Sequence, residues 1–208
     1  MVATDGGNVA SFRNLSSAMT TGGTTPIYIS FLVNSTSTPS NPNTSYAGIS
    51  LYNSSTGTEQ FFMGMPFGRV NYGWDIQPGT GVGAINSSGP AVDGTVNLLV
   101  YRLSQGISGT TNVELFANPT PGQPLPAPTA SRLNFRTNFV FNQIRIQAGV
   151  GSDVHLNFDE LRIGDSFDSV APVIPEAGTM SLVVGAAVSI FAFRRSRWKR
   201  LAAFARSL

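Results

Sequence analysis

Residues 143–148 read QIRIQA, and polar and apolar side chains alternate strictly through these six positions. Successive side chains of a β-strand point to opposite faces, so the three apolar residues are expected against a core and the three polar residues in water. One-sided strands of this kind are typical of antiparallel sheets that have one solvated face. The stretch therefore predicts an antiparallel β protein.

Seven further segments support this prediction, because they either alternate or are compactly apolar. Turn-forming runs such as 53–57, which reads NSSTG, separate them. No segment before residue 172 indicates a soluble helix. Residues 1–171 are therefore predicted to form an all-β, antiparallel jelly-roll β-sandwich. The expected strands are 27–33, 47–52, 59–63, 70–76, 96–103, 112–117, 139–148 and 155–163.

The last expected strand continues into residues 158–172, FDELRIGDSFDSVAP. This run resembles the closing strand of laminin-G-like and concanavalin-A-like jelly rolls, which implies the same sandwich. Its alternation changes phase at Asp159 and Glu160, because Phe158 lies in one phase and Leu161 and Ile163 lie in the other. A β-bulge is therefore predicted at the two acidic residues.

Residues 177–193, AGTMSLVVGAAVSIFAF, form an uncharged apolar run of 17 residues. As a helix the run would be about 25 Å long, at the short end of what spans a bilayer. Arg194, Arg195 and Arg197 follow at once and would stop transfer, leaving the basic tail 194–208 in the cytoplasm. One C-terminal transmembrane helix is predicted here, rather than a buried helix of a soluble domain, because the run has no polar face.

Pro175 and Glu176 stand directly before this run, so that residues 172–208 resemble the PEP-CTERM sorting signal of Gram-negative bacteria. The resemblance implies recognition by the membrane transpeptidase exosortase at Pro175-Glu176. It also implies residence in the inner membrane before processing, and at the cell surface or in extracellular matrix afterwards. The usual second proline is replaced by Ala177, and the tail continues beyond the arginines.

Export normally requires an N-terminal signal peptide with a basic start and an apolar run. The first residues, MVATDGGNVASFRNLSS, contain neither. We therefore expect a start further upstream, with a signal peptide and one or more N-terminal strands before residue 1. The alternative is a cytoplasmic domain whose tail signal is inert.

Charge is distributed unevenly along the chain. Residues 1–176 carry seven arginines and eleven acids, a net charge of −4, whereas 194–208 carry six cations and no acid. The overall pI near 9.3 therefore reflects the tail, and nucleic acid is excluded as a partner of the domain. The chain has no cysteine, which excludes disulfides, thiolate metal sites and thiol catalysis.

The sequence offers few candidates for catalysis. Asp159 and Glu160 are adjacent and should point to opposite faces, unlike the paired carboxylates of a glycosidase. His155 is the single histidine, which argues against histidine-based catalysis or metal binding. No catalytic, cofactor-binding or metal residue is assigned. Calcium stays open as an alternative through Asp153, Asp159, Asp165 and Asp168.

These observations predict a non-enzymatic, exported surface or matrix protein sorted through its C-terminal signal. One alternative is a surface carbohydrate-binding module for extracellular polysaccharide, with Tyr46, Tyr72 or Trp74 as aromatic platforms. A second alternative is a secreted glycosidase that acts through Glu160.

Overall fold

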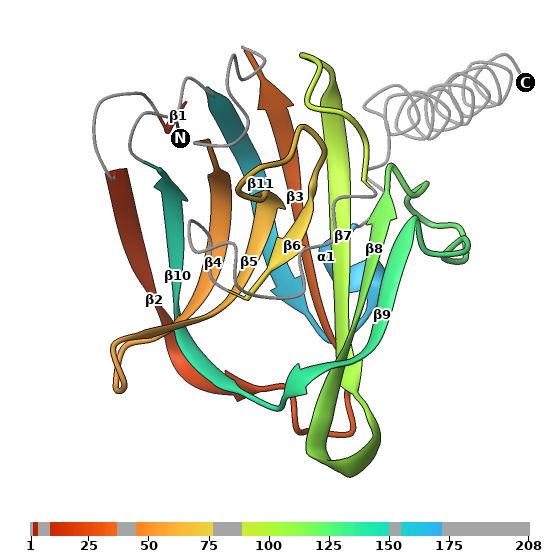
Figure 1. Cartoon of the computed structure of the whole chain (residues 1–208). Helices are drawn as coiled ribbons and strands as arrows, with labels where there is room; N and C mark the ends of the chain where they lie inside the picture. The colour runs from red at the N-terminus through yellow and green to blue at the C-terminus, as the bar shows by residue number, and fades with distance from the viewer. Residues whose placement is uncertain (1, 4–8, 37–44, 77–88, 150–154, 172–208) are drawn as a thin grey trace, which may run out of the picture. The chain divides into compact units, whose positions relative to one another are not determined.

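The computed structural model describes residues 2–3, 9–36, 45–76, 89–149 and 155–171. The described strands form two antiparallel sheets (Figure 1). In spatial order the six-stranded sheet contains β1 (Val2–Ala3), β11 (Leu156–Gly164), β3 (Ile27–Ser35), β7 (Val96–Gln105), β8 (Thr110–Ala117) and β9 (Ala130–Thr137). The five-stranded sheet contains β2 (Val9–Thr20), β10 (Val140–Ala148), β4 (Ala47–Asn53), β5 (Thr58–Met65) and β6 (Gly73–Asp75).

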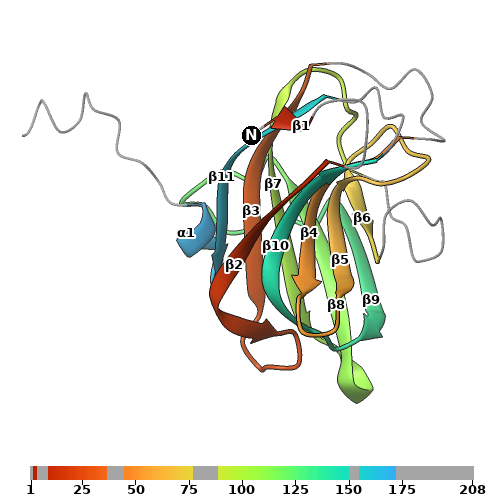
Figure 2. The same cartoon turned by 90° about the vertical axis from the view of Figure 1, so that its left-hand side faces the viewer.

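The two sheets face each other as the layers of a β-sandwich (Figure 2). Between them lies a core rich in aromatic rings, in which Phe31 and Tyr101 of one sheet meet Phe61 of the other. The buried Tyr101 hydroxyl donates to the Gly73 carbonyl at 2.6 Å and so joins β7 to β6 across the sandwich. The prediction of an all-β, antiparallel jelly-roll sandwich is confirmed.

All eight expected strands are present, although their ends differ by a few residues. Three described strands were not expected from the sequence, namely β1, β2 and β9, and all three lie at sheet edges. Edge strands pair on one side only and can carry polar residues in both phases, which obscures their alternation. The predicted bulge in β11 is confirmed, because its register against β3 shifts between Asp159 and Arg162 and Glu160 has a φ of +54°.

The outer face of the six-stranded sheet is covered by a short helix, α1 (Phe167–Val170). Phe167 and Val170 pack with Tyr28, Val100 and Phe116 in a second apolar cluster. Ser30 of β3 donates its hydroxyl to the Val170 carbonyl at 2.6 Å. The end of the described chain is thereby fixed on the face that is remote from the five-stranded sheet.

No helix within the described ranges has the length and apolarity needed to cross a bilayer. The predicted transmembrane run 177–193, the sorting pair Pro175-Glu176 and the arginines at 194, 195 and 197 lie outside the described residues. The described residues all fall within one compact unit.

Candidate functional site

The polar side chains of residues 143–148 belong to β10 and lie on the outer face of the five-stranded sheet. Because Ile144 and Ala148 pack into the core, the intervening Arg145 and Gln147 point outward. The expectation that this row faces water is wrong in part, since Gln147 is only 1% exposed and Arg145 is partly buried. Other side chains therefore cover this face and form a site on it.

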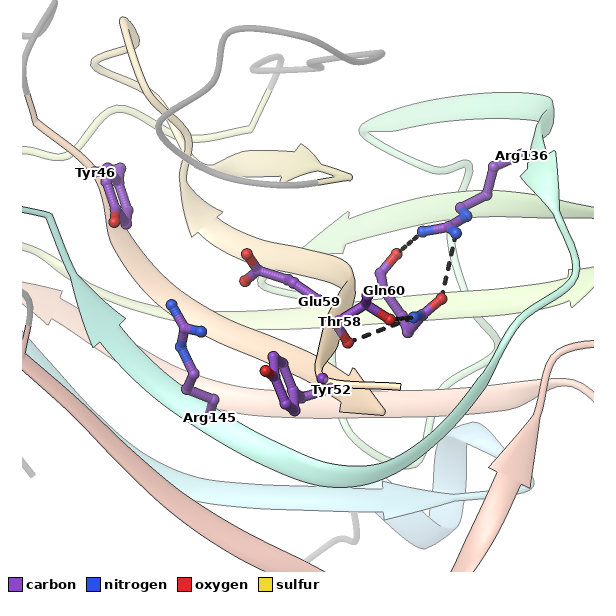
Figure 3. Close-up of a pocket in the computed structure, with 8 residues that line it drawn as sticks. Tyr46, Tyr52, Thr58, Glu59, Gln60, Arg136 and Arg145 are labelled. Atoms are coloured by element: carbon purple, nitrogen blue, oxygen red, sulfur yellow. Dashed lines mark hydrogen bonds between the residues drawn. The ribbon is translucent and has the colours of Figure 1, made fainter. Parts of the chain in front are cut away.

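A pocket of about 540 Å³ opens over this face (Figure 3). Its walls come from the segment before β4, from the hairpin that β4 and β5 form with their connecting turn, and from strands β9 and β10. Residues far apart in sequence thus converge on one cavity. The lining residues are Tyr46, Tyr52, Gly57, Thr58, Glu59, Gln60, Arg136 and Arg145.

A bulge in β5 turns two consecutive polar side chains toward this pocket. In the β4–β5 ladder Leu51 pairs with Phe61, but Tyr52 pairs with Glu59, so Gln60 is the extra residue. Regular alternation would place Glu59 in phase with the buried Phe61. The bulge instead puts Glu59 on the outer face, opposite Tyr52, and lets Gln60 line the pocket beside it.

Glu59 is held by a small network of hydrogen bonds that crosses three strands. Gln147 of β10 donates through Nε2 to Glu59 Oε1 at 2.5 Å and to the Ser50 hydroxyl at 2.7 Å. Ser50 of β4 donates its hydroxyl to the same carboxylate oxygen. Burial raises the pKa of Glu59 above its ordinary value, although the donors from Ser50 and Gln147 and the charge of Arg145 act in the opposite direction. The Glu59 carboxylate is therefore a stronger base than an ordinary glutamate, and its orientation is fixed.

Arg145 brings a positive charge into the same pocket. Its guanidinium carbon lies 5.6 Å from the ring centre of Phe12 and 5.7 Å from that of Tyr52. Its buried Nε has no hydrogen-bond partner among the described residues. The ion pairs found in the described ranges, Arg102–Glu114 and Arg162–Glu160, lie elsewhere. The Arg145 guanidinium is therefore held mainly by aromatic rings and can serve an external anion.

Tyr46 completes this end of the pocket, and Figure 3 shows its hydroxyl on the side where Arg145 lies. Its ring packs edge-on against Phe62, with centroids 6.1 Å apart. Gly149 allows the ring to lie close to the backbone, since a Cβ at that position would come within 2.3 Å of Tyr46 Cε1. Burial raises the pKa of the Tyr46 phenol, and the charge of Arg145 partly offsets this effect. The phenol is therefore protonated at neutral pH.

The opposite end of the pocket is formed by Arg136 of β9, which reaches across to β5. Its Nη1 donates to the Gln60 carbonyl and its Nη2 donates to Gln60 Oε1 at 3.3 Å (Figure 3). The guanidinium carbon lies 4.9 Å from the ring centre of Phe139. Burial lowers the pKa of Arg136. Two arginines thus stand at the two ends of one cavity, with Glu59 between them.

The aromatic platforms that the sequence suggested are distributed differently. Tyr72 and Trp74 are fully buried in the core between the sheets and cannot stack on a ligand. Tyr46 lines the pocket. Core packing thus explains two of the three aromatic residues.

The acidic residues of β11 lie on the other sheet. Glu160 pairs with Arg162, and Asp159 Oδ1 accepts a hydrogen bond from the Glu160 backbone amide. His155 stands directly before β11, and its carbonyl accepts from the Thr36 amide. Among the described residues no group of three or more potential ligands could hold a metal ion. Of the four aspartates considered for calcium, Asp153 lies outside the described residues.

This chain is similar to known proteins in three-dimensional structure, but not in sequence. No family model matches the chain, and no curated protein sequence does. The chain is similar to the solved structure of an endo-β-1,4-glucuronan lyase from the fungus Trichoderma reesei, with 12% identity and a TM-score of 0.56 over 81% of this chain and 80% of that one. It is also similar to an alginate lyase from Corynebacterium sp., with 10% identity and a TM-score of 0.43 over 72% of this chain and 62% of that one.

At this level of identity the likeness establishes the fold. The expectation of a non-enzymatic, sorted surface protein is corrected on one finding: the similar structure with a TM-score of 0.56 is that of a polysaccharide lyase. From the sequence, only Asp159, Glu160 and His155 were considered as catalytic groups. The groups that converge in the pocket are instead the carboxylate of residue 59, the guanidinium of residue 145 and the phenol of residue 46.

Proposed function

We propose that this chain is a polysaccharide lyase that acts on a polymer of uronate sugars. The observation that carries the proposal is the convergence of Arg145, Glu59 and Tyr46 in one pocket on the outer face of the five-stranded sheet. The likeness in fold to a glucuronan lyase supports the choice of substrate class by analogy.

Elimination from a uronate needs three chemical functions. A cation must neutralise the sugar carboxylate so that the neighbouring C5–H becomes acidic, a base must remove that proton, and an acid must protonate the departing O4. The C4–O4 bond breaks as the C4–C5 double bond forms. Water is not consumed, which distinguishes the reaction from hydrolysis.

Arg145 is suited to the first function. A guanidinium presents several N–H donors in a fixed fork that matches a carboxylate. Its guanidinium lies against the rings of Phe12 and Tyr52, and the ion pairs of the described residues do not involve it. A bound uronate would thus supply the anion.

Glu59 is suited to act as the base. Both donors from Ser50 and Gln147 end on Oε1, and Figure 3 shows the carboxylate extending toward the end of the pocket where Tyr46 and Arg145 lie. Burial raises its pKa, which makes the ionised carboxylate a stronger base than an ordinary glutamate. Glu59 would take the C5 proton.

Tyr46 is suited to act as the acid. Burial keeps the phenol protonated at neutral pH. The nearby Arg145 charge would stabilise the phenolate that forms when the proton passes to O4. Glu59 and Tyr46 together would therefore account for both proton transfers.

The test is incubation of the purified protein with polyglucuronate while ultraviolet absorbance of the unsaturated uronate product is followed. We expect a steady increase with the natural chain and a loss of about 10²-fold or more with Arg145→Ala, because stabilisation of developing charge is removed. Arg145→Lys should recover only part of the rate, since an ammonium lacks the planar fork.

Two outcomes would overturn the proposal. Saturated products would indicate a hydrolase, and tight binding of polyglucuronate without turnover would indicate a binding module. Arg102→Lys is a suitable control, because Arg102 pairs with Glu114 on the six-stranded sheet and should leave the rate unchanged.

The cellular address predicted from residues 172–208 stays a separate proposal. We propose that Pro175 and Glu176 form a PEP-CTERM-like signal read by exosortase at the inner membrane, with Arg194, Arg195 and Arg197 retained in the cytoplasm. A reporter fused after Leu208 should then be cytoplasmic. A periplasmic reporter would exclude this topology.

A further inference from the structure

We infer that Arg136 and Gln60 form a second carboxylate-binding position, so that productive binding requires two uronates of one polymer at the same time. This inference rests on the proposed function and deepens it. The position lies at the end of the pocket opposite Arg145 (Figure 3).

Arg136 carries a charge that no acid in the described residues balances. It is partly buried, its two described hydrogen bonds go to neutral oxygens of Gln60, and the ion pairs of the described residues lie elsewhere. A partly desolvated cation that has only neutral partners is costly, and an incoming anion relieves that cost. The lowered pKa of Arg136 is consistent with this desolvation.

The Arg136 side chain is held in place on two sides. Its guanidinium lies over the Phe139 ring and is hydrogen-bonded to Gln60 at the β5 bulge. Gln60 is fixed in turn, since its Nε2 donates to the Thr58 hydroxyl at 2.6 Å. A guanidinium has five N–H donors, and two of its nitrogens are used here, so donors are left for a ligand. The position is therefore preorganised.

The two positions are well separated on the sheet. Arg145 lies on β10 and Gln60 lies on β5, with β4 between them. Two inter-strand spacings separate these backbones by about 10 Å. The Arg136 guanidinium is bonded to Gln60, and Figure 3 shows the Arg145 guanidinium at the other end of the pocket, so one sugar carboxylate is not expected to contact both. Two carboxylates of the same chain can.

The test uses a series of polyglucuronate samples in which a known fraction of carboxyl groups has been reduced to alcohols. If two carboxylates are bound, kcat/KM of the natural chain should fall approximately as the square of the remaining carboxylate fraction. For Arg136→Gln it should fall only as the first power. On intact polymer Arg136→Gln should raise KM by about tenfold or more while kcat changes little, because a charged hydrogen-bonding site is lost.

Arg132→Gln is the matched control, because Arg132 lies on the same strand but outside the pocket lining. In Arg132→Gln, kcat/KM should still fall as the square of the carboxylate fraction, and KM should equal that of the natural chain. A first-power dependence in the natural chain, or an unchanged KM in Arg136→Gln, would overturn the inference while leaving the lyase proposal intact. If Arg136→Gln fails to fold by circular dichroism, Arg136→Lys takes its place. It should raise KM by a smaller factor, and an unchanged KM would again overturn the inference.

Failure of the proposed function would look different. If the natural chain yields no unsaturated product, calorimetric binding of intact polyglucuronate still tests this position. Weaker binding by Arg136→Gln than by Arg132→Gln would support the inference, and equal binding would overturn it.

Discussion

Gln147 of β10 donates to Glu59 of β5 at 2.5 Å, across the strand β4 that lies between them. This contact holds the candidate base at a fixed position and joins the bulged strand to the strand that carries Arg145. Because burial raises the pKa of Glu59, the ionised carboxylate is less stable in the folded protein than in the unfolded chain. Replacing Glu59 by a neutral residue should therefore lower the activity and raise the stability of the protein.

The Glu59→Gln variant should be inactive and yet more stable than the natural chain at neutral pH. Since the pKa is raised on folding, the contribution of Glu59 to stability is fully present below the unfolded value near 4.5 and is lost as pH rises through the folded pKa. Denaturant unfolding at several pH values measures this difference. Equal stability of the two proteins at neutral pH would contradict the raised pKa.

The acid limb of the pH–rate profile should report the same group. Glu59 acts as a base only when it is ionised, so kcat/KM should fall as pH decreases through a pKa above the usual glutamate range. An acid limb at or below 4.5, the ordinary pKa of a glutamate, would show that another group removes the proton.

Tyr46→Phe removes the phenolic proton and keeps the ring that packs against Phe62. We expect kcat to fall by about 10²- to 10⁴-fold, as for loss of a general acid, with little change in polymer binding. Rapid-quench kinetics together with calorimetry would separate the two effects. Retention of kcat would remove Tyr46 from the mechanism.

Gly149→Ala tests the placement of Tyr46 without removing a functional group. The new methyl group would come within 2.3 Å of the ring, so the ring must move. We expect kcat to fall, because small displacements of an acid from its substrate slow proton transfer. Gly109→Ala provides a stability control, since a Cβ there meets nothing within 4 Å, although its φ of +73° adds strain.

Trp74→Ala should destabilise the fold by about 3–5 kcal/mol, because a fully buried aromatic side chain leaves a cavity. Any loss of polysaccharide binding in this variant would follow from unfolding, as thermal melts would show. Glu160→Gln should change stability by about 1 kcal/mol or less, since it removes an exposed ion pair, and should leave the lyase rate unchanged. A large loss of rate in Glu160→Gln would place the chemistry on β11.

Much of the fold was predictable because the central strands carry clear signals. The alternation in 143–148 placed Ile144 and Ala148 in the core, and the phase change at Asp159 predicted the bulge in β11. The edge strands β1, β2 and β9 lacked such a signal, since one of their sides has no partner to enforce it.

The candidate site was less accessible to sequence reasoning. In the alternation that the sequence predicts, Glu59 shares the phase of Phe61 and belongs to the core, and only the unseen bulge at Gln60 turns it outward. Arg145 was expected to be a solvated polar residue. The aromatic rings that cover it belong to residues 12 and 52, which are remote in sequence and gave no local signal. Contacts between residues so far apart depend on the order of the strands in the sheet, and this order cannot be read from the spacing of residues along the sequence.

The central claim is that this pocket breaks a uronate polymer by elimination, and product mass tests it most directly. Digestion of polyglucuronate followed by mass spectrometry should yield oligosaccharides that are lighter by one water molecule than the corresponding hydrolysis products, and Arg145→Ala should yield none. Oligosaccharides of full hydrolytic mass, or polymer that is bound but left intact, would contradict the account.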